Sequence, residues 1–267
     1  MGGSGDAEEE HLSGSVGAVR VGSTVRKVAG PWTPTIHALL RFLRDAGFDL
    51  APEPLGFDDR GREMLTWLDG TAAMRPWPDA LLRDEGVVAL AHALRRFHDV
   101  VRAFDPGEEA CWRVGSRALE PGEVVCHGDF APWNTVWTAG RLVGVIDWDM
   151  AEPGIPTADV TFLAQHLVPL RSDTWARGVG FAAPPPRAWR LALLCEAYGG
   201  ITPDDVIDAA PALYERDRGR TLSLGSEGKE PWATFLHEGA LGLIEEDTAW
   251  LRENGAALAD PDRDGVR

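Results

Sequence analysis

Side chains with carboxylate, amide and imidazole groups are concentrated in residues 124–149, which read VVCHGDFAPWNTVWTAGRLVGVIDWD. His127, Asp129 and Asn134 follow the pattern HxDxxxxN, and Asp147 lies thirteen residues after Asn134. Phosphoryl transfer requires a carboxylate that accepts the proton of an attacking hydroxyl, and oxygen ligands for a Mg2+ that bridges nucleotide phosphates. The residue types and their spacing therefore predict that Asp129 faces the acceptor while Asn134 and Asp147 face one metal ion.

Two short apolar strands are expected to position these side chains. Residues 124–126 precede His127, and residues 142–146 end at Asp147, with a turn at Ala139-Gly140 before the second run. Apolar runs that lead into acids indicate two paired strands, which deliver their charged groups to one edge of a sheet. A metal or a reacting hydroxyl would meet the carboxylates at that edge.

Residues 12–70 are predicted to form a small β-rich lobe. Small and β-branched residues around Gly14 and Gly17 indicate a glycine-containing turn and two short antiparallel strands. Gly14 and Gly17 could let the backbone approach a nucleotide phosphate, although no complete GxGxxG or GxxxxGK[ST] is present and plain hairpin turns are an equal alternative. The lobe is completed by a helix and two strands, expected at 35–45, 55–57 and 63–68.

The rest of the chain is predicted to be mainly helical. Residues 71–260 are expected to form a second lobe that holds the HxDxxxxN loop and the acceptor site, because apolar residues recur there at helical spacing. Residues 1–11 and 261–267 are polar, and we expect a disordered tail at 1–11 and a polar tail at 261–267. The expected helices lie at 81–101, 159–170, 187–198, 203–214 and 232–253.

The segments HGDFAPWN and VIDWD resemble the aminoglycoside phosphotransferase and choline kinase type of small-molecule kinase. Those proteins commonly carry HGDxxxxN followed by an ID dipeptide on the next strand, and the protein-kinase motifs HRDxxxxN and DFG are a more distant version. The resemblance implies a two-lobed, protein-kinase-like α+β fold and transfer of the γ-phosphate of ATP or GTP to a hydroxyl of a small molecule. It implies that Asp129 is the catalytic base and that His127 braces the loop. Asn134 and Asp147 would hold Mg2+, and Asp149 would have only a supporting part.

The same resemblance implies a cation on the third strand of the first lobe that reaches the nucleotide phosphates. Arg26 and Lys27 stand together in VRKVA, and strand alternation lets only one of them face the nucleotide. We favour Arg26 slightly, and the alternative is that both are solvated charges at a strand edge. The family often pairs this cation with a helix glutamate, but no Glu occurs between Thr35 and Arg44, where His37 lies near the expected place.

Adenine is expected to lie between the lobes, against the backbone that follows the strand EMLTWL. Thr66, Trp67 and Leu68 are the candidates for this contact, and the Trp67 ring belongs either to the nucleotide site or to the core. Trp133, inside the HxDxxxxN loop, either shapes the acceptor site or packs under the loop.

The composition argues against several other classes of protein. The chain has 42 acidic and 26 basic residues and a net charge of -16, which opposes nucleic acid or an anionic membrane as partner. The acidic balance either keeps the protein soluble or attracts a cationic small molecule. No apolar run could span a bilayer and the N-terminus is polar, so we expect a cytoplasmic protein. The cysteines include no CxxC pair and predict neither a disulfide framework nor a zinc site.

The resemblance implies a small acceptor that could be cationic, such as an aminoglycoside or another antibiotic, and alternatives to this function remain open. The acceptor could be a metabolite, such as a choline-like amine, an amino-acid derivative or a sugar. A catalytically weak, kinase-like nucleotide-binding protein is favoured by the missing helix glutamate and opposed by the intact Asp129, Asn134 and Asp147. A metal-dependent hydrolase could use the same acids, but the sequence lacks the extra His and carboxylate ligands of a two-metal site.

Overall fold

The computed structural model of this protein describes residues 9–12, 17–115 and 117–260. Gly14, residues 1–8 and the expected tail at 261–267 lie outside the described residues. The chain divides into two compact units. The first unit comprises residues 1–74, 96–129 and 133–154, and the second comprises residues 75–95, 130–132 and 155–267.

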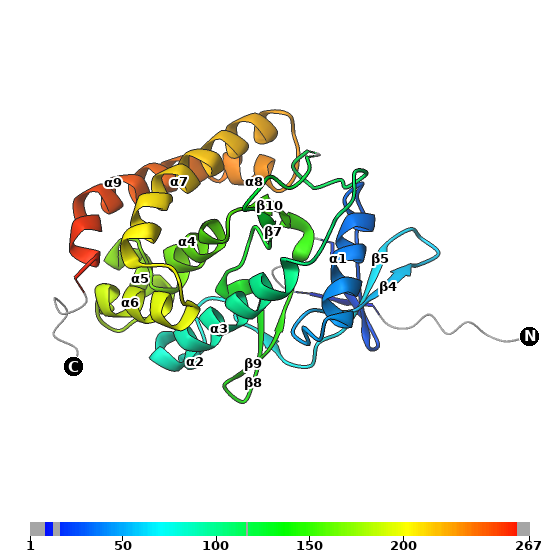
Figure 1. The fold of residues 1–267 in the computed structure, drawn as a ribbon, viewed down its shortest axis with the longest axis horizontal. Coiled ribbons are helices and arrows are strands. Elements are labelled where there is room, and N and C mark those ends of the chain that lie inside the picture. Colours follow the sequence, from blue (N-terminus) through cyan, green and yellow to red (C-terminus); the bar gives the residue numbers. More distant parts are fainter. Residues whose placement is uncertain (1–8, 13–16, 116, 261–267) are drawn as a thin grey trace, which may run out of the picture. The chain divides into compact units, whose positions relative to one another are not determined.

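A five-stranded antiparallel sheet belongs to the first unit (Figure 1). Its strands, in spatial order, are β1 (Glu10–His11), β2 (Val19–Val21), β3 (Thr24–Lys27), β5 (Glu63–Thr66) and β4 (Pro54–Phe57). The expected strands at 55–57 and 63–68 and the expected pair before residue 29 are thereby confirmed, within a few residues at their ends. Glu10 and His11 do not belong to a tail, because their backbone groups find partners opposite Arg20 and Val19.

One helix of the first unit, α1 (Thr33–Asp45), packs against β4. Its buried apolar side chains recur at helical spacing and confirm the predicted inner face; they are Ile36, Leu39, Leu40 and Leu43. His37 is also buried on this helix, with 2% of its surface exposed. A polar ring that is withdrawn from water in this way requires a hydrogen-bond partner.

Two smaller sheets complete the first unit. In one, β8 (Thr135–Thr138) lies between β6 (Thr71–Ala72) and β9 (Arg141–Val145), and in the other β7 (Val124–Cys126) pairs with β10 (Glu152–Gly154). The prediction that the strands on either side of the HxDxxxxN loop pair with each other is therefore wrong. The turn at Ala139 and Gly140, with φ of 50° and 76°, is a two-residue hairpin turn that joins β9 to β8 instead.

A buried tryptophan anchors the segment after β9. Trp148 lies in the short 3-10 helix η2 (Trp148–Met150) and is 1% exposed. Its ring centroid lies 5.0 Å from that of Phe97 and 6.3 Å from that of Phe48, and its indole N–H donates to the carbonyl of Val145 at 2.9 Å. Aromatic side chains of this size supply much of the burial in a core, so the backbone next to Asp147 is held firmly.

The second unit is helical. Its elements are α2 (Asp79–Leu82), the first part of α3 (Asp84–Val101), α4 (Pro156–Leu167), α5 (Asp173–Gly178), α6 (Arg187–Tyr198), α7 (Pro203–Ser226), α8 (Trp232–His237) and α9 (Ala240–Leu258). The predicted helix at 187–198 is matched by α6. The prediction for 203–214 ends too early, because α7 continues to Ser226. The predicted helix at 232–253 is in fact α8 and α9, separated at Gly239.

Helix α7 packs against α4, α8 and α9 in this unit. Among the described residues, no helix combines the length and the apolar character that a membrane crossing requires.

Candidate active site

The loop after β7 depends on a glycine. Gly128 has φ of 78°, and a Cβ atom at this position would lie 2.0 Å from the carbonyl oxygen of Met150. No other residue could adopt this conformation and this approach without moving the backbone. Gly128 therefore lets the loop turn close to η2, with His127 and Asp129 on either side.

His127 connects the loop to the end of β9. The ring is fully buried and its centroid lies 4.6 Å from that of Trp148. The backbone N–H of Asp129 donates to His127 Nδ1 at 3.3 Å, so the ring proton resides on Nε2, which donates to the carbonyl of Ile146 at 3.2 Å. These contacts are those of a brace, and the role of His127 stays a prediction.

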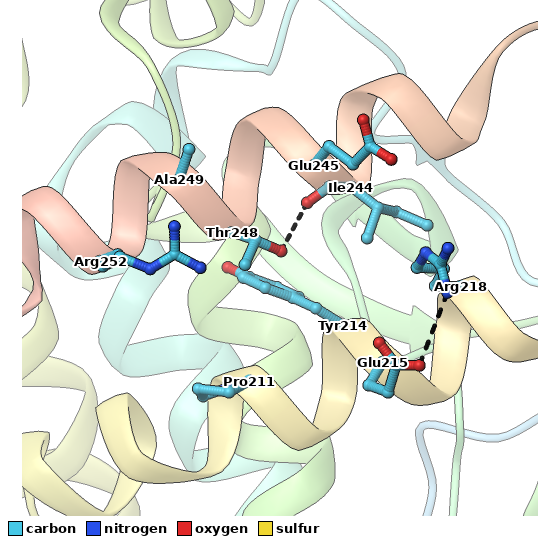
Figure 2. A pocket seen from close by; sticks show the side chains of 9 residues that line it. All are labelled: Pro211, Tyr214, Glu215, Arg218, Ile244, Glu245, Thr248, Ala249 and Arg252. Carbon is cyan, nitrogen blue, oxygen red and sulfur yellow. Dashed lines mark hydrogen bonds and ion pairs between the residues drawn. The ribbon is translucent and has the colours of Figure 1, made fainter.

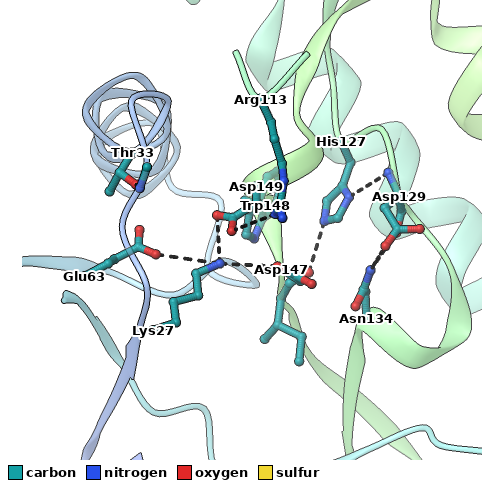
Figure 3. Close-up of polar contacts among 12 residues, drawn as sticks. Lys27, Thr33, Glu63, Arg113, His127, Asp129, Asn134, Asp147, Trp148 and Asp149 are labelled. Carbon is teal, nitrogen blue, oxygen red and sulfur yellow. Dashed lines mark hydrogen bonds and ion pairs between the residues drawn. The ribbon is translucent and has the colours of Figure 1, made fainter. Parts of the chain in front are cut away.

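Asp129 and Asn134 hold each other in the loop (Figure 3). The Asn134 amide nitrogen donates to the Asp129 carbonyl at 2.9 Å and to its carboxylate Oδ2 at 2.7 Å. The indole N–H of Trp133 lies 3.4 Å from the same Oδ2, so Trp133 contacts the candidate base directly. The carboxylate of Asp129 is thus fixed in orientation, which a group that receives a proton from a bound hydroxyl requires.

Asp147 has a strained backbone at the end of β9. Its φ of 60° and ψ of 61° are left-handed, a conformation that is uncommon outside glycine and that clusters at functional sites. The Asp147 side chain is 48% exposed. The strained turn therefore presents a carboxylate outward, immediately beside the buried Trp148.

The structure separates the two candidate cations on β3. Lys27 Nζ lies 3.3 Å from Asp147 Oδ1 and 2.8 Å from Asp149 Oδ1 (Figure 3). Arg26 instead lies on the opposite face of the strand, 3.6 Å from Asp58. The slight preference for Arg26 is therefore corrected in favour of Lys27, and contact with phosphate stays a prediction.

The ammonium and the acids change each other's ionisation. Burial alone would lower the pKa of Lys27, but Asp147 and two further carboxylates outweigh it and raise the pKa well above its ordinary value. Desolvation would raise the pKa of Asp147, but Lys27 outweighs this effect and holds it below its ordinary value. Burial raises the pKa of Asp149, which also lies near the like charge of Asp147. Lys27 and Asp147 are therefore charged at neutral pH.

Sequence reasoning missed two side chains of this cluster and undervalued a third. Glu63 lies 3.6 Å from Lys27 Nζ, and Arg113 lies 3.4 Å from Asp149 and 4.8 Å from the centre of the Trp32 ring. Glu63 and Arg113 are distant from the motif in sequence, so no local spacing reveals them. Lys27, by contrast, carried a signal: Lys27 and Lys229 are the lysines of a chain that otherwise uses arginine for its cations.

The residues around Asp147 suit a divalent cation. Mg2+ prefers carboxylate and amide oxygens. The amide nitrogen of Asn134 is used by Asp129, which leaves its oxygen available, and Asp147 supplies an exposed carboxylate. The ammonium of Lys27, held between Asp147 and Asp149, marks a place where the acids attract positive charge. Asn134 and Asp147 therefore fit the predicted metal ligands.

A mainly apolar pocket of about 290 Å³ in the first unit includes Lys27 and Asp147 in its lining. The predicted adenine-contacting residues Thr66, Trp67 and Leu68 also line it. The Trp67 ring is half-buried with the guanidinium of Arg20 4.3 Å above it, so it is not a core residue.

Two of these backbone groups are already engaged: the Thr66 N–H donates to Glu53 and the Trp67 N–H donates to Ser23. Leu68 is then the better candidate of the three for a backbone contact to a base. Gly17 does not line the pocket, although its neighbour Ala18 does.

A second hollow, of about 360 Å³, lies between α7 and α9 in the second unit (Figure 2). The Tyr214 ring projects from α7 toward α9 across it. The polar contacts among the residues that line this hollow stay within one helix each: the Thr248 hydroxyl donates to the carbonyl of Ile244 at 2.7 Å, and Arg218 lies 3.7 Å from Glu215. None of its lining residues belongs to the candidate active site.

Comparison with known proteins agrees with this geometry. The phosphotransferase enzyme family matches residues 108–193. The trifolitoxin immunity protein of Rhizobium leguminosarum bv. trifolii is 35% identical over 191 residues, which are 70% of this chain and 71% of that protein.

Solved structures show the same fold at lower identity. A choline/ethanolamine kinase family protein from Mesorhizobium loti has a TM-score of 0.57 and 17% identity, with 95% of this chain and 93% of that chain covered. An amicoumacin kinase in complex with AMP-PNP, Ca2+ and Ami has a TM-score of 0.60 and 10% identity, with 92% and 88% covered. The resemblance and the fold class expected from the sequence are confirmed. The chain belongs to the phosphotransferase enzyme family: it is a small-molecule kinase by family and has a protein-kinase-like α+β fold.

Proposed function

We propose that this protein transfers the γ-phosphate of ATP or GTP to a hydroxyl of a small molecule. The observation that carries the proposal is that the backbone of Ile146, next to Asp147, is hydrogen-bonded to two residues of the HxDxxxxN loop. Its carbonyl accepts from His127 Nε2 at 3.2 Å, and its N–H donates to the Asn134 carbonyl at 2.9 Å. Lys27 reaches the adjacent Asp147 at 3.3 Å. A lysine, a metal-suited carboxylate and an HxDxxxxN loop, which are groups that phosphoryl transfer uses, thus lie around Ile146 and Asp147.

Each side chain has a distinct part in the proposal. Asp129, oriented by Asn134 and Trp133, accepts the proton of the acceptor hydroxyl. Lys27 contacts the nucleotide phosphates as a permanent cation. Asn134 and Asp147 would hold Mg2+, which when bound supplies positive charge against the transferring phosphoryl group.

The acceptor is proposed to be an antibiotic or a toxin with a free hydroxyl. The relative that is 35% identical is named as an immunity protein against trifolitoxin, and a structural neighbour is named as a kinase of amicoumacin. The net charge of -16 favours a cationic acceptor within this class, such as an aminoglycoside. A choline-like amine, an amino-acid derivative or a sugar remains the alternative acceptor. A cytoplasmic location, where ATP and GTP are available, belongs to the same proposal.

A kinase-like protein that binds without turnover is a second candidate. Its support is that the relative is named for immunity, a function that sequestration of a toxin would also provide. The missing helix glutamate no longer favours it, because Glu63 supplies a carboxylate beside Lys27.

The test is a screen of acceptors by nucleotide consumption. The protein is incubated with Mg2+ and either ATP or GTP against aminoglycosides, amicoumacin, other hydroxylated antibiotics, choline-like amines and sugars. ADP or GDP release is measured together with the mass of the product, and Asp129→Asn serves as the matched inactive variant.

We expect one acceptor class to gain a phosphoryl group with wild type and not with Asp129→Asn. Nucleotide binding without release of ADP or GDP would instead support the binding protein, and ADP without a phosphorylated product would support hydrolysis.

A further inference from the structure

The ammonium of Lys27 has carboxylates on two sides. Asp147 and Asp149 belong to the segment that is proposed to hold the metal, and they lie 3.3 and 2.8 Å from Nζ. Glu63, 3.6 Å from Nζ, comes from the neighbouring strand β5. Lys27 and Glu63 are directly opposite each other in the antiparallel pairing of β3 with β5. Opposite residues point to the same face of a sheet, so the register itself brings Glu63 to Lys27.

Glu63 has further support from α1. Its Oε1 lies 2.9 Å from His37 Nε2, while its Oε2 has no hydrogen-bond partner and faces the ion pair with Lys27. Glu63 is 1% exposed and His37 is 2% exposed. A carboxylate this deeply buried is costly unless a cation and a hydrogen-bond donor compensate it. His37 also packs against Phe57, with ring centroids 5.3 Å apart, which fixes the imidazole.

The carboxylates around Lys27 are not equivalent. Asp147 is 48% exposed and is a proposed metal ligand, whereas Glu63 is enclosed by protein. In the free protein Asp147 and Asp149 share the ammonium with Glu63. When Asp147 is engaged by a metal, the ammonium needs carboxylates that the metal does not use. Asp149, 6% exposed, and Glu63, 1% exposed, remain for it, and Glu63 comes from the strand that pairs with that of Lys27.

We propose that Glu63 and His37 are positioning residues that hold Lys27 toward the nucleotide phosphates, and this inference rests on the proposed function. Protein kinases hold the corresponding lysine with a glutamate on a helix. Here α1 has no glutamate and supplies an imidazole, while the carboxylate comes from the sheet that also carries the lysine. The anchor of Lys27 is therefore set by strand register, and a shift of α1 would loosen Glu63 without removing it from Lys27.

The decisive variant is Glu63→Gln, which keeps the shape and removes the charge. Without the charge of Glu63, the ammonium keeps Asp149 and Asp147 as its carboxylate partners, and the metal also requires Asp147. We expect the Kd for ATP at saturating Mg2+, measured by calorimetry, to rise about tenfold, and the Mg2+ concentration at half-maximal ATP binding to rise as well. Returning a carboxylate from the helix, by adding His37→Glu to Glu63→Gln, should recover part of the lost affinity.

The matched control is Asp58→Asn. Asp58 is a half-buried residue next to the same sheet, with 6% of its side chain exposed, but it pairs with Arg26 and Arg62 away from Lys27. We expect its Kd for ATP to stay within about twofold of wild type, because its partners do not include Lys27. Equal Kd values and equal Mg2+ midpoints for wild type, Glu63→Gln and Asp58→Asn would overturn the inference and leave the proposed function standing. Absence of ATP binding by wild type would overturn both.

A second readout keeps the inference testable if Glu63→Gln does not fold. Lys27 and Lys229 are the lysines of the chain, so lysine labelled with 15N at Nζ gives signals from these two side chains. Lys229 is 58% exposed and serves as the internal reference. We expect His37→Phe to shift the Lys27 signal in the complex with ATP and Mg2+ and to leave the Lys229 signal unchanged. A Lys27 signal that does not respond to His37→Phe would overturn the positioning role of His37 and Glu63.

Discussion

Replacing Gly128 by alanine should damage the HxDxxxxN loop more than any ordinary glycine substitution. Two costs add at this position. The φ of 78° is left-handed, which costs a residue with a Cβ about 1 kcal/mol. The new Cβ would also lie 2.0 Å from the Met150 carbonyl oxygen, so the loop and η2 would have to separate. Because η2 directly precedes β10, which pairs with β7, we expect a total loss of about 3 to 4 kcal/mol in the free energy of unfolding.

Gly140→Ala provides the matched control. Gly140 has φ of 76°, nearly the same as Gly128, but a Cβ there would meet nothing within 4 Å. Its expected cost is therefore the backbone cost alone, about 1 kcal/mol. Urea unfolding of both variants and of wild type measures the difference, and calorimetry with ATP and Mg2+ measures the effect on the site. If Gly128→Ala and Gly140→Ala lie within about 0.5 kcal/mol of each other, the close approach of Gly128 to Met150 does not constrain the loop.

Further predictions concern β3, the core and the second unit. Lys27→Met should raise the Kd for ATP, measured by calorimetry, about tenfold or more, while the Kd of Arg26→Met should stay within about twofold of wild type. A larger rise in Kd for Arg26→Met than for Lys27→Met would assign the phosphate contact to Arg26. Trp148→Phe removes the indole donor and should cost about 1 to 3 kcal/mol in urea unfolding, whereas an unchanged midpoint would mean that the bond to Val145 contributes nothing. Burial lowers the pKa of His166 well below its ordinary value. Below about pH 6.5, His166 therefore binds a proton in the unfolded chain but stays neutral in the folded protein. The free energy of unfolding then falls by up to about 1.4 kcal/mol per pH unit as the pH is lowered. The midpoint temperature of thermal unfolding should therefore fall more steeply between pH 7 and pH 5 for wild type than for His166→Gln. Equal slopes of midpoint against pH would refute this prediction.

The HxDxxxxN loop was predictable because its chemistry is local. Asp129 and Asn134 are five residues apart, and the hydrogen bonds that the Asn134 amide donates to Asp129 follow from one tight turn. Asp147 was predictable because the apolar residues before it indicate a strand that ends at an acid. The helical spacing of α1 and α6 likewise requires no knowledge of their neighbours.

Strand pairing was less predictable, because it depends on partners that are distant in sequence. No strand is predicted above for residues 135–138, although their alternation of β-branched and aromatic residues before the Ala139-Gly140 turn is the signal of a hairpin strand. Omitting it led to the wrong partner for β7.

The surroundings of Lys27 were not predictable from local pattern. Glu63 reaches Lys27 through the register of β3 and β5, which are separated by about 35 residues of sequence that include α1 and β4. The choice between Arg26 and Lys27 depended on which face of β3 meets the pocket. Val25 lines that pocket together with Lys27, so an apolar residue two positions earlier was the available indication of the inward face.

The most direct test of the candidate active site is the Mg2+ dependence of ATP binding in wild type and in Asp147→Ala. Calorimetric titrations of ATP are performed with Mg2+ and with a chelator, and thermal unfolding checks that the variant is folded. We predict that wild type binds ATP more tightly with Mg2+ than without it, and that Asp147→Ala remains folded and loses this difference. An undiminished Mg2+ effect in folded Asp147→Ala would contradict the assignment of Asp147 as a metal ligand.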